Sequence, residues 1–302
     1  MEKPQSVLIL GASGRIGGDL HQRLRAQYPE MRLLGTGRKV VSGEHWQAFD
    51  PFRDDWGNLS GPFDVVVNAI GAIRPSRAMP YTRIHTDLTR RLLAERQGLG
   101  NPHIVQVSAL GARLDHPVPF LQTKGEADAL LLAEPDTSVV RPSVVCHPET
   151  VLQARLEKLL DGARFSFGRL LVPRGFPATR IQPIWPSDLA ALIAEMVRQK
   201  PTGIVPAVGG EVFTFGDLLQ MMAQAKGRSL SLVELPRKMV EGLVRNIISV
   251  WFPGVLNYDQ FQLLFLDNIG DAAIATALLG RAPRSTRGFW RGKPDPDALG
   301  RG

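Results

Sequence analysis

The chain has 302 residues, of which 44% are hydrophobic and 22% charged, as is usual for a soluble globular protein with a large core. It has no apolar run of membrane-spanning length, no signal-peptide core at its N-terminus and a single cysteine, Cys146, so we expect a cytoplasmic protein without an internal disulfide. Its net charge of +7 is concentrated after residue 280, where six basic side chains stand against two acidic ones. The body is therefore only mildly basic, and we expect no nucleic-acid surface.

Residues 7–17, VLILGASGRIG, predict a buried strand, a glycine turn and the start of a helix with apolar residues four apart. The free N–H groups and the dipole of a helix N-terminus favour a phosphate there. Gly11 allows a sharp turn, Gly14 a close approach of the pyrophosphate, and Gly17 close packing of helix on strand. An ordinary corner without a ligand is the alternative. The predicted dinucleotide contacts are Gly11, Ala12, Ser13, Gly14, Arg15 and Ile16.

The second predicted strand, residues 33–36, is followed by Arg38 and Lys39. An NAD site usually has an acidic residue here for the ribose 2′-hydroxyl, and this chain has none. Two adjacent cations suit a 2′-phosphate, which Arg38 can bind bidentately and Lys39 as a point charge. We therefore predict NADP(H) in preference to NAD(H). The alternative is that both cations are ordinary solvated side chains.

Further strands are predicted at residues 47–49, 65–67, 104–108 and 138–140, with helices at 81–96 and 120–133. This alternation predicts an α/β fold, a doubly wound parallel sheet of the Rossmann type. Ligands of such sheets lie beyond the carboxyl ends of the strands. We accordingly assign further cofactor contacts to Ala69, Ile70, Gly71, Pro142, Ser143 and Val144. Asp50, after the third strand, either accepts from the adenine amino group or caps the turn that Pro51 begins.

Three regions are expected. Residues 1–145 form a dinucleotide-binding domain, whose sheet is completed by later strands. Residues 146–280 form a smaller substrate-side lobe, and residues 281–302 a basic, mobile tail. Proline and aromatic residues become frequent after residue 160. Residues 236–250 form a basic amphipathic pattern, which either packs on the protein or lies on a membrane surface. No motif with metal-ligand spacing is present, and we predict no metal site.

These motifs resemble the extended and atypical short-chain dehydrogenase/reductase superfamily. The resemblance rests on the glycine turn, on VSALGA at residues 107–112, on Lys124, on RPS at 141–143 and on QPI at 182–184 before SDLA. Within the superfamily, FTFGDL at 213–218 and the segments around residues 259–268 are most similar to the group of the NADPH-binding accessory subunit of respiratory complex I and its bacterial relatives.

The resemblance implies a catalytic Ser, Tyr and Lys, with Tyr and Lys four residues apart on one helix face. Ser108 and Lys124 match, and Lys124 is also expected to hold the nicotinamide ribose. Phe120 occupies the Tyr position and has no hydroxyl to exchange a proton. Tyr81 is a candidate substitute. His85, where the family often has asparagine, is either a proton relay or a partly buried helix histidine.

Two functions remain open from the sequence. The chain is an NADP(H)-dependent oxidoreductase or epimerase-type enzyme acting on a small molecule without the usual tyrosine. Alternatively, it is a non-catalytic cofactor-binding protein that serves assembly or redox sensing in a respiratory or membrane-associated complex, peripheral to the membrane. The sequence indicates neither the substrate nor the oligomeric state.

Overall fold

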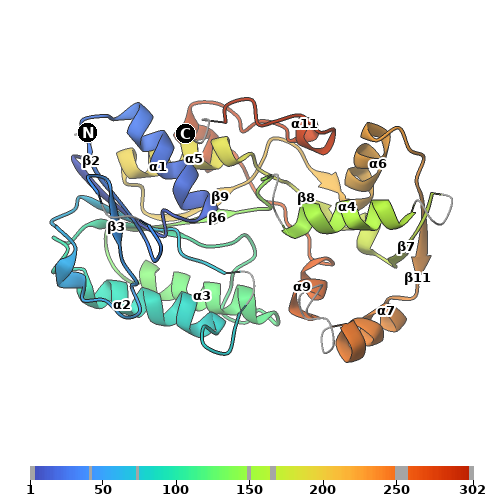
Figure 1. The fold of residues 1–302 in the computed structure, drawn as a ribbon, viewed down its shortest axis with the longest axis horizontal. Helices are drawn as coiled ribbons and strands as arrows, with labels where there is room; N and C mark the ends of the chain where they lie inside the picture. The colour runs from blue at the N-terminus through green and yellow to red at the C-terminus, as the bar shows by residue number, and fades with distance from the viewer. Residues whose placement is uncertain are drawn as a thin grey trace.

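The computed structural model describes residues 4–40, 43–72, 75–147, 151–163, 168–248 and 258–298. Within them the central sheet has seven parallel strands in the order β3-β2-β1-β4-β5-β6-β9 (Figure 1). The strands are β1 (Ser6–Leu10), β2 (Arg32–Gly37), β3 (Trp46–Ala48), β4 (Val65–Asn68), β5 (His103–Val107), β6 (Thr137–Pro142) and β9 (Gly203–Ala207). The predicted doubly wound Rossmann-type sheet is confirmed.

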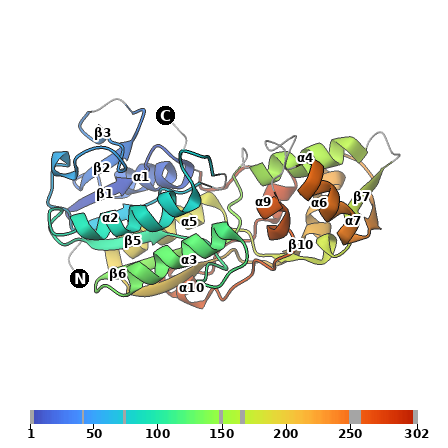
Figure 2. The same cartoon turned by 90° about the horizontal axis from the view of Figure 1, so that it is seen from below.

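Helices cover both faces of this sheet (Figures 1 and 2). One face carries α1 (Arg15–Gln27), α5 (Pro186–Gln199) and α10 (Ala273–Leu279). The other face carries the π-helical turn η2 (Arg83–Asp87), α2 (Leu88–Glu95) and α3 (Pro119–Leu132), with the short 3-10 turn η1 (Trp56–Asn58) nearby.

The apolar run of β1 is explained by this double cover. Val7 and Ile9 belong to the core cluster that contains Leu20 of α1, whereas Leu8 and Leu10 belong to the opposite cluster. All four strand residues are fully buried. A strand packed on both faces needs apolar residues at every position, which is why no polar alternation is seen in its sequence.

Residues after 145 contribute to two structures. They return a strand and a helix, β9 and α5, to the central sheet, and they also build a second lobe with its own core of leucine, methionine and aromatic side chains (Figure 1). The lobe's strands are β7 (Arg169–Pro173), β8 (Arg180–Ile181), β10 (Phe213–Thr214) and β11 (Ser231–Leu235). Its helical elements are α4 (Val151–Ala163), η4 (Phe176–Ala178), α6 (Phe215–Ala225), α7 (Arg237–Leu243), η5 (Val244–Ile248), α9 (Tyr258–Leu263) and α11 (Arg287–Trp290).

The structure corrects the expectation of a mobile tail for its described part, residues 281–298. Phe289 and Trp290 in α11 are only 7% and 3% exposed. Asp188, in the first turn of α5, is fully buried and accepts hydrogen bonds from Arg281 and Arg284. The basic composition suggested a solvated segment, but these cations neutralise a carboxylate almost a hundred residues away in the chain. Residues 299–302 lie outside the described part.

The amphipathic segment after residue 236 presents apolar groups to solvent. Met239 and Leu243 of α7 are 57% and 47% exposed, whereas Val244 is buried. Its last two residues, 249 and 250, are outside the described part. Among the described residues, no helix combines the length and apolarity needed to cross a bilayer.

Candidate functional site

The glycine turn between β1 and α1 has the tight geometry that its sequence predicted. Gly11 has a φ of 79°, and a Cβ there would lie 2.8 Å from Cγ1 of Ile70. A Cβ at Gly17 would overlap the carbonyl oxygen of Gly11, so the close packing of helix on turn depends on glycine. Gly14 is the N-cap of α1, and no side chain caps this helix end. The first N–H groups of α1 are therefore available to an anion.

The end of β2 lies directly against this turn. A Cβ at Gly37 would overlap the side chain of Ser13, so glycine is required where the two segments meet. Arg38 and Lys39 follow in an exposed turn. The two predicted 2′-phosphate ligands thus stand at the same sheet edge as the predicted pyrophosphate site.

Asp50 forms the hydrogen bond expected of a turn cap, because its Oδ1 accepts from the N–H of Phe52 at 3.0 Å. Its own N–H is bonded to Asp54 at 2.7 Å. The structure therefore supports the turn-capping interpretation, and the adenine contact stays a prediction.

The segment after β4 connects the glycine turn to the candidate catalytic lysine. Asn68 is fixed by Gln106, whose Oε1 accepts from Asn68 Nδ2 at 2.9 Å, and its own Oδ1 accepts from the N–H of Ile70 at 3.1 Å. A Cβ at Gly71 would lie 3.5 Å from Lys124 Nζ. The predicted dinucleotide contacts thus form a continuous series from Gly11 through Ile70 and Gly71 to Lys124. We call this series the dinucleotide track.

Lys124 lies on the buried face of α3. Its side chain is 4% exposed, and Nζ donates to the carbonyl oxygen of Val107 at 2.7 Å. Burial lowers the pKa of this amine to about 8, with the nearby Asp128 acting in the opposite direction. The fixed ammonium leaves further N–H donors for a ligand.

Ser108, at the end of β5, belongs to a buried polar network. Its hydroxyl donates to Oδ2 of Asp128 at 2.8 Å. Arg141 Nε donates to the same oxygen at 2.9 Å, and Arg141 Nη2 lies 2.9 Å from it in an ion pair. Burial raises the pKa of Asp128, and the hydrogen bonds from Ser108 and Arg141 oppose that rise.

Phe120 packs with both candidate substitutes for the missing tyrosine. Its ring centroid is 5.7 Å from that of Tyr81 and 5.7 Å from that of His85, and Tyr81 stacks on His85 at the same separation. Burial raises the pKa of Tyr81 to about 12, with a contribution from Asp259 of the second lobe. The pKa of His85 falls to about 2 because the ring is buried and lies near Lys124.

The segment after β6 is anchored to the second lobe. Ser143 Oγ donates to the carbonyl oxygen of Gln182 at 2.5 Å. The N–H of Val144 donates to Asn268 Oδ1 at 3.1 Å. Pro142 ends β6 and pairs with Ala207 of β9. The predicted contacts Pro142, Ser143 and Val144 therefore lie where sheet and lobe join, and whether they touch a cofactor stays a prediction.

No protein-family model matches the sequence. It is 24% identical over 310 residues to NADH dehydrogenase (ubiquinone) 1 alpha subcomplex subunit 9, mitochondrial, of Arabidopsis thaliana, which covers 93% of this chain and 75% of the relative. It is 22% identical over 319 residues to sterol demethylase protein B of Methylococcus capsulatus, which covers 93% of this chain and 95% of the relative.

Solved structures with the same fold include nucleotide-sugar enzymes. A nucleoside-diphosphate-sugar epimerase from Staphylococcus aureus superposes with a TM-score of 0.73 at 16% identity, over 95% of this chain and 99% of that one. UDP-glucuronic acid 4-epimerase from Bacillus cereus, in complex with UDP-glucuronic acid and NAD, has a TM-score of 0.69 at 15% identity, over 95% and 96%. The sequence relative from Arabidopsis and the folds of these solved structures support the resemblance of the chain to the extended short-chain dehydrogenase/reductase superfamily.

The resemblance to this superfamily makes the departures around Lys124 informative. A superfamily enzyme is expected to present a tyrosine and a serine hydroxyl to its substrate. Here Phe120 has none, and the single hydroxyl proton of Ser108 is donated to Asp128. Ser108 can accept a hydrogen bond from a ligand, but it has no second proton to donate to a carbonyl oxygen.

His85 does not have the properties of a proton relay. Thr123 Oγ1 donates its proton to the carbonyl of Pro119 at 2.9 Å, so it must accept from Nδ1 of His85, also at 2.9 Å. This fixes the tautomer and leaves Nε2 as a buried acceptor with no hydrogen-bond partner among the described residues. With a pKa of about 2 the ring stays neutral at physiological pH. The structure favours the alternative, a buried histidine.

Sequence reasoning missed Asp128 and Arg141 as members of the site. The spacing of four between Lys124 and Asp128 on α3 is the only local signal, because it places both on one helix face. Arg141 was recognised only as part of a motif. Among the described residues no group of three or more His, Cys, Asp or Glu side chains is placed to hold a metal ion.

Proposed function

We propose that this superfamily member binds NADP(H) and holds the nucleotide without the tyrosine-dependent chemistry of its relatives. One observation carries the proposal: Phe120 stands one helical turn before the buried Lys124, and the Ser108 proton is held by Asp128. Binding groups are thus retained at a site whose usual proton donors are missing or engaged.

The residues of the glycine turn fit a dinucleotide. The uncapped N-terminus of α1 provides N–H donors for the pyrophosphate, and the turn has no room for a Cβ at Gly11 or Gly17. Lys124, next to Gly71, would hold the nicotinamide ribose hydroxyls. When bound, the nucleotide supplies a hydride donor or acceptor. The protein's own contribution is to position it and to keep water from the buried amine.

The preference for NADP(H) over NAD(H) rests on Arg38 and Lys39. Both follow β2 in an exposed turn, and the end of β2 abuts Ser13 of the glycine turn. A ribose held at that turn would bring its 2′-phosphate to these cations, where a bidentate guanidinium contact stabilises the doubly charged group.

A role in a respiratory complex follows from the Arabidopsis relative, whose name places it in the NADH dehydrogenase alpha subcomplex. In this role the bound nucleotide stabilises the fold and its redox state is sensed by the assembly. A ligand at 100 times its dissociation constant adds about 2.7 kcal/mol to the free energy of unfolding. The site of action would be cytoplasmic, peripheral to a membrane through surfaces such as α7.

The second candidate is an oxidoreductase or epimerase-type enzyme acting on a small molecule. It is favoured by the Methylococcus relative, whose name describes a sterol demethylase protein, and by the Tyr81 hydroxyl in the cluster with Phe120. The raised pKa of Tyr81 argues against this hydroxyl as an acid or base near neutral pH.

The test is a titration of the purified protein with NADPH and with NADH, in which tryptophan fluorescence and melting temperature are measured. It is carried out on the wild type, on Arg38→Asp and on a control, Lys158→Asp, which lies on the exposed side of α4. We expect NADPH to bind at least about tenfold more tightly than NADH, and Arg38→Asp alone to remove the difference. Equal binding of both nucleotides by the wild type would overturn the NADP(H) preference. Absence of any binding would overturn the proposal.

Turnover separates the two candidates. The wild type is mixed with NADPH and a panel of aldehydes, ketones and quinones, and absorbance at the nicotinamide band is followed. The binding proposal expects no oxidation above the rate without protein. Protein-dependent oxidation that disappears in Tyr81→Phe would establish the enzyme instead.

A further inference from the structure

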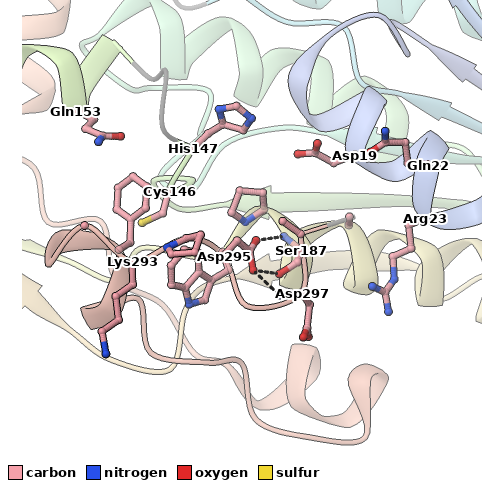
Figure 3. A pocket seen from close by; sticks show the side chains of 17 residues that line it. Asp19, Gln22, Arg23, Cys146, His147, Gln153, Ser187, Lys293, Asp295 and Asp297 are labelled. Carbon is pink, nitrogen blue, oxygen red and sulfur yellow. Dashed lines mark hydrogen bonds between the residues drawn. The ribbon is translucent and has the colours of Figure 1, made fainter. Parts of the chain in front are cut away.

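A cavity of about 530 Å³ is lined by residues other than the predicted dinucleotide contacts. Figure 3 shows the side chains that line it. It is bounded by α1, by the segment after β6, by α4, by the start of α5, and by α11 with the C-terminal segment that follows it. None of the predicted cofactor or catalytic residues lines it. Its volume falls within the range of about 300–1,000 Å³ that is typical of small-molecule sites.

The C-terminal wall of this cavity is firmly held. Asp295 accepts hydrogen bonds from the N–H and the hydroxyl of Ser187, at 3.0 and 2.6 Å (Figure 3). Trp185 Nε1 donates to the carbonyl oxygen of Ser285 at 2.9 Å. Arg284 joins the same segment to the buried Asp188. The wall is therefore built by tertiary contacts.

The interior of the cavity is largely apolar. Trp185 and Phe289 meet edge to face with ring centroids 5.7 Å apart, and both are almost fully buried. Cys146 and Ala190 complete this side, at 1% and 3% exposed. Burial raises the pKa of the Cys146 thiol, so it stays a neutral apolar surface.

The charged side chains that line the cavity are three carboxylates, Asp19, Asp295 and Asp297, and two cations, Arg23 and Lys293. Asp295 is satisfied by Ser187, and Asp297 pairs with Arg284 at 2.6 Å. Arg23, on α1, lies near enough to Glu195 for its charge to lower the pKa of that carboxyl, but its Nε is buried without a hydrogen-bond partner among the described residues. The nearby Glu195 already accepts from Arg198 and Gln199. A buried guanidinium N–H without an acceptor is costly, so a ligand that places an acceptor at Nε of Arg23 would remove this cost.

We propose that this cavity binds a small amphiphilic carboxylate. The apolar body of the ligand lies against Trp185 and Phe289, and its carboxylate accepts from Arg23. Because the lining residues are separate from the dinucleotide track, this site and the dinucleotide site are occupied independently.

Calorimetric titration of the full chain with decanoate, and with decanol as its uncharged counterpart, tests the proposal. The variants are Arg23→Gln, Ala190→Phe to fill the apolar side, and Arg25→Gln as a matched control, since Arg25 is an exposed cation on the same helix outside the lining. NADPH affinity is measured on every sample, so that failure of this site is separate from failure of the dinucleotide site.

We expect one decanoate per chain. Arg23→Gln should weaken decanoate by about tenfold and leave decanol unchanged, because a charge-assisted hydrogen bond is lost. Ala190→Phe should weaken the binding of both ligands, and Arg25→Gln should weaken the binding of neither. No binding of decanoate, or an equal loss in Arg23→Gln and Arg25→Gln, would overturn the proposal.

Discussion

The hydroxyl of Ser108 donates to the buried carboxylate of Asp128 over 2.8 Å, across 20 residues of sequence. The same carboxylate oxygen accepts a hydrogen bond from Nε of Arg141 and forms an ion pair with its Nη2. This arrangement turns the serine of a superfamily catalytic set into a hydrogen-bond acceptor toward any ligand. It also ties the ends of β5 and β6 to α3, beneath the site.

Asp128→Asn is expected to lower the free energy of unfolding by about 3 kcal/mol, at the low end for breaking a buried ion pair because Arg141 remains 20% exposed. Ser108→Ala removes one hydrogen bond to a charged group and should cost about 1.5 kcal/mol. Urea unfolding of both variants measures the difference. Equal losses would show that Arg141 contributes nothing through Asp128.

Phe120→Tyr places a hydroxyl one turn before Lys124, on the same face of α3. We expect NADPH affinity to stay within about threefold of the wild type and carbonyl-dependent NADPH oxidation to appear, since the lysine that supports such a hydroxyl is in place. Phe120→Leu is the control, because it changes the side chain without adding a hydroxyl. Oxidation by the wild type at the rate of Phe120→Tyr would contradict the binding proposal.

Lys124→Met tests the buried amine through the pH dependence of stability. The pKa of Lys124 is lowered from 10.5 to about 8 in the folded chain. Between these values the unfolded chain binds a proton that the folded chain does not, so the stability of the wild type should rise with pH from about 8 to 10. Below about pH 8 Lys124 is protonated in both the folded and the unfolded chain, so the gain in stability from its deprotonation is absent there.

Urea unfolding at pH 7.5, 8.5 and 9.5 follows this slope, with the nucleotide absent. In Lys124→Met the rise should disappear. A variant that keeps the same rise would show that another group titrates in this window.

Gly17→Ala should damage both fold and cofactor site, because its Cβ would overlap the carbonyl oxygen of Gly11. Overpacking of this kind costs about 2 to 3 kcal/mol and moves α1 away from the turn, so NADPH affinity should fall with melting temperature. Gly162→Ala, in α4 with nothing within 4 Å, is the control and should be neutral or stabilising by up to about 1 kcal/mol. Similar melting temperatures for the two variants would contradict the packing argument.

Asp188→Asn should remove an acid-sensitive link to the C-terminal segment. Burial opposes the ionisation of Asp188, but hydrogen bonds from Arg281 and Arg284 outweigh it and hold its pKa below the ordinary 3.8. A lowered carboxyl pKa stabilises the fold above about pH 4, and this stability is lost as pH falls through the folded value.

Melting temperatures between pH 6 and 3 measure this effect. The wild type should lose more stability on acidification than Asp188→Asn, which starts lower at pH 6. Asp115→Asn, at an exposed ion pair, should follow the wild type. An unchanged acid profile in Asp188→Asn would show that the pairing with Arg281 and Arg284 does not hold the segment.

The sequence alone determined the parallel sheet, the glycine turn and the substitution at Phe120. These features depend on local rules: β-branched and leucine runs form strands, a positive φ requires glycine, and residues four apart share a helix face. The family resemblance gave Lys124 its expected role and identified Phe120 as a substitution, and the strand pattern located the cations after β2. The local rules failed for the C-terminal segment, where composition indicated a solvated tail.

Only the tertiary structure decided which groups pair. The partner of Ser108 lies on another element, the cations of the C-terminal segment find Asp188 on α5, and the neutral state of His85 depends on burial beside Lys124. The energy of a charge or a hydroxyl proton depends on its surroundings in space, which sequence spacing does not specify. The cavity beside Arg23 likewise exists only because segments distant in the sequence meet there.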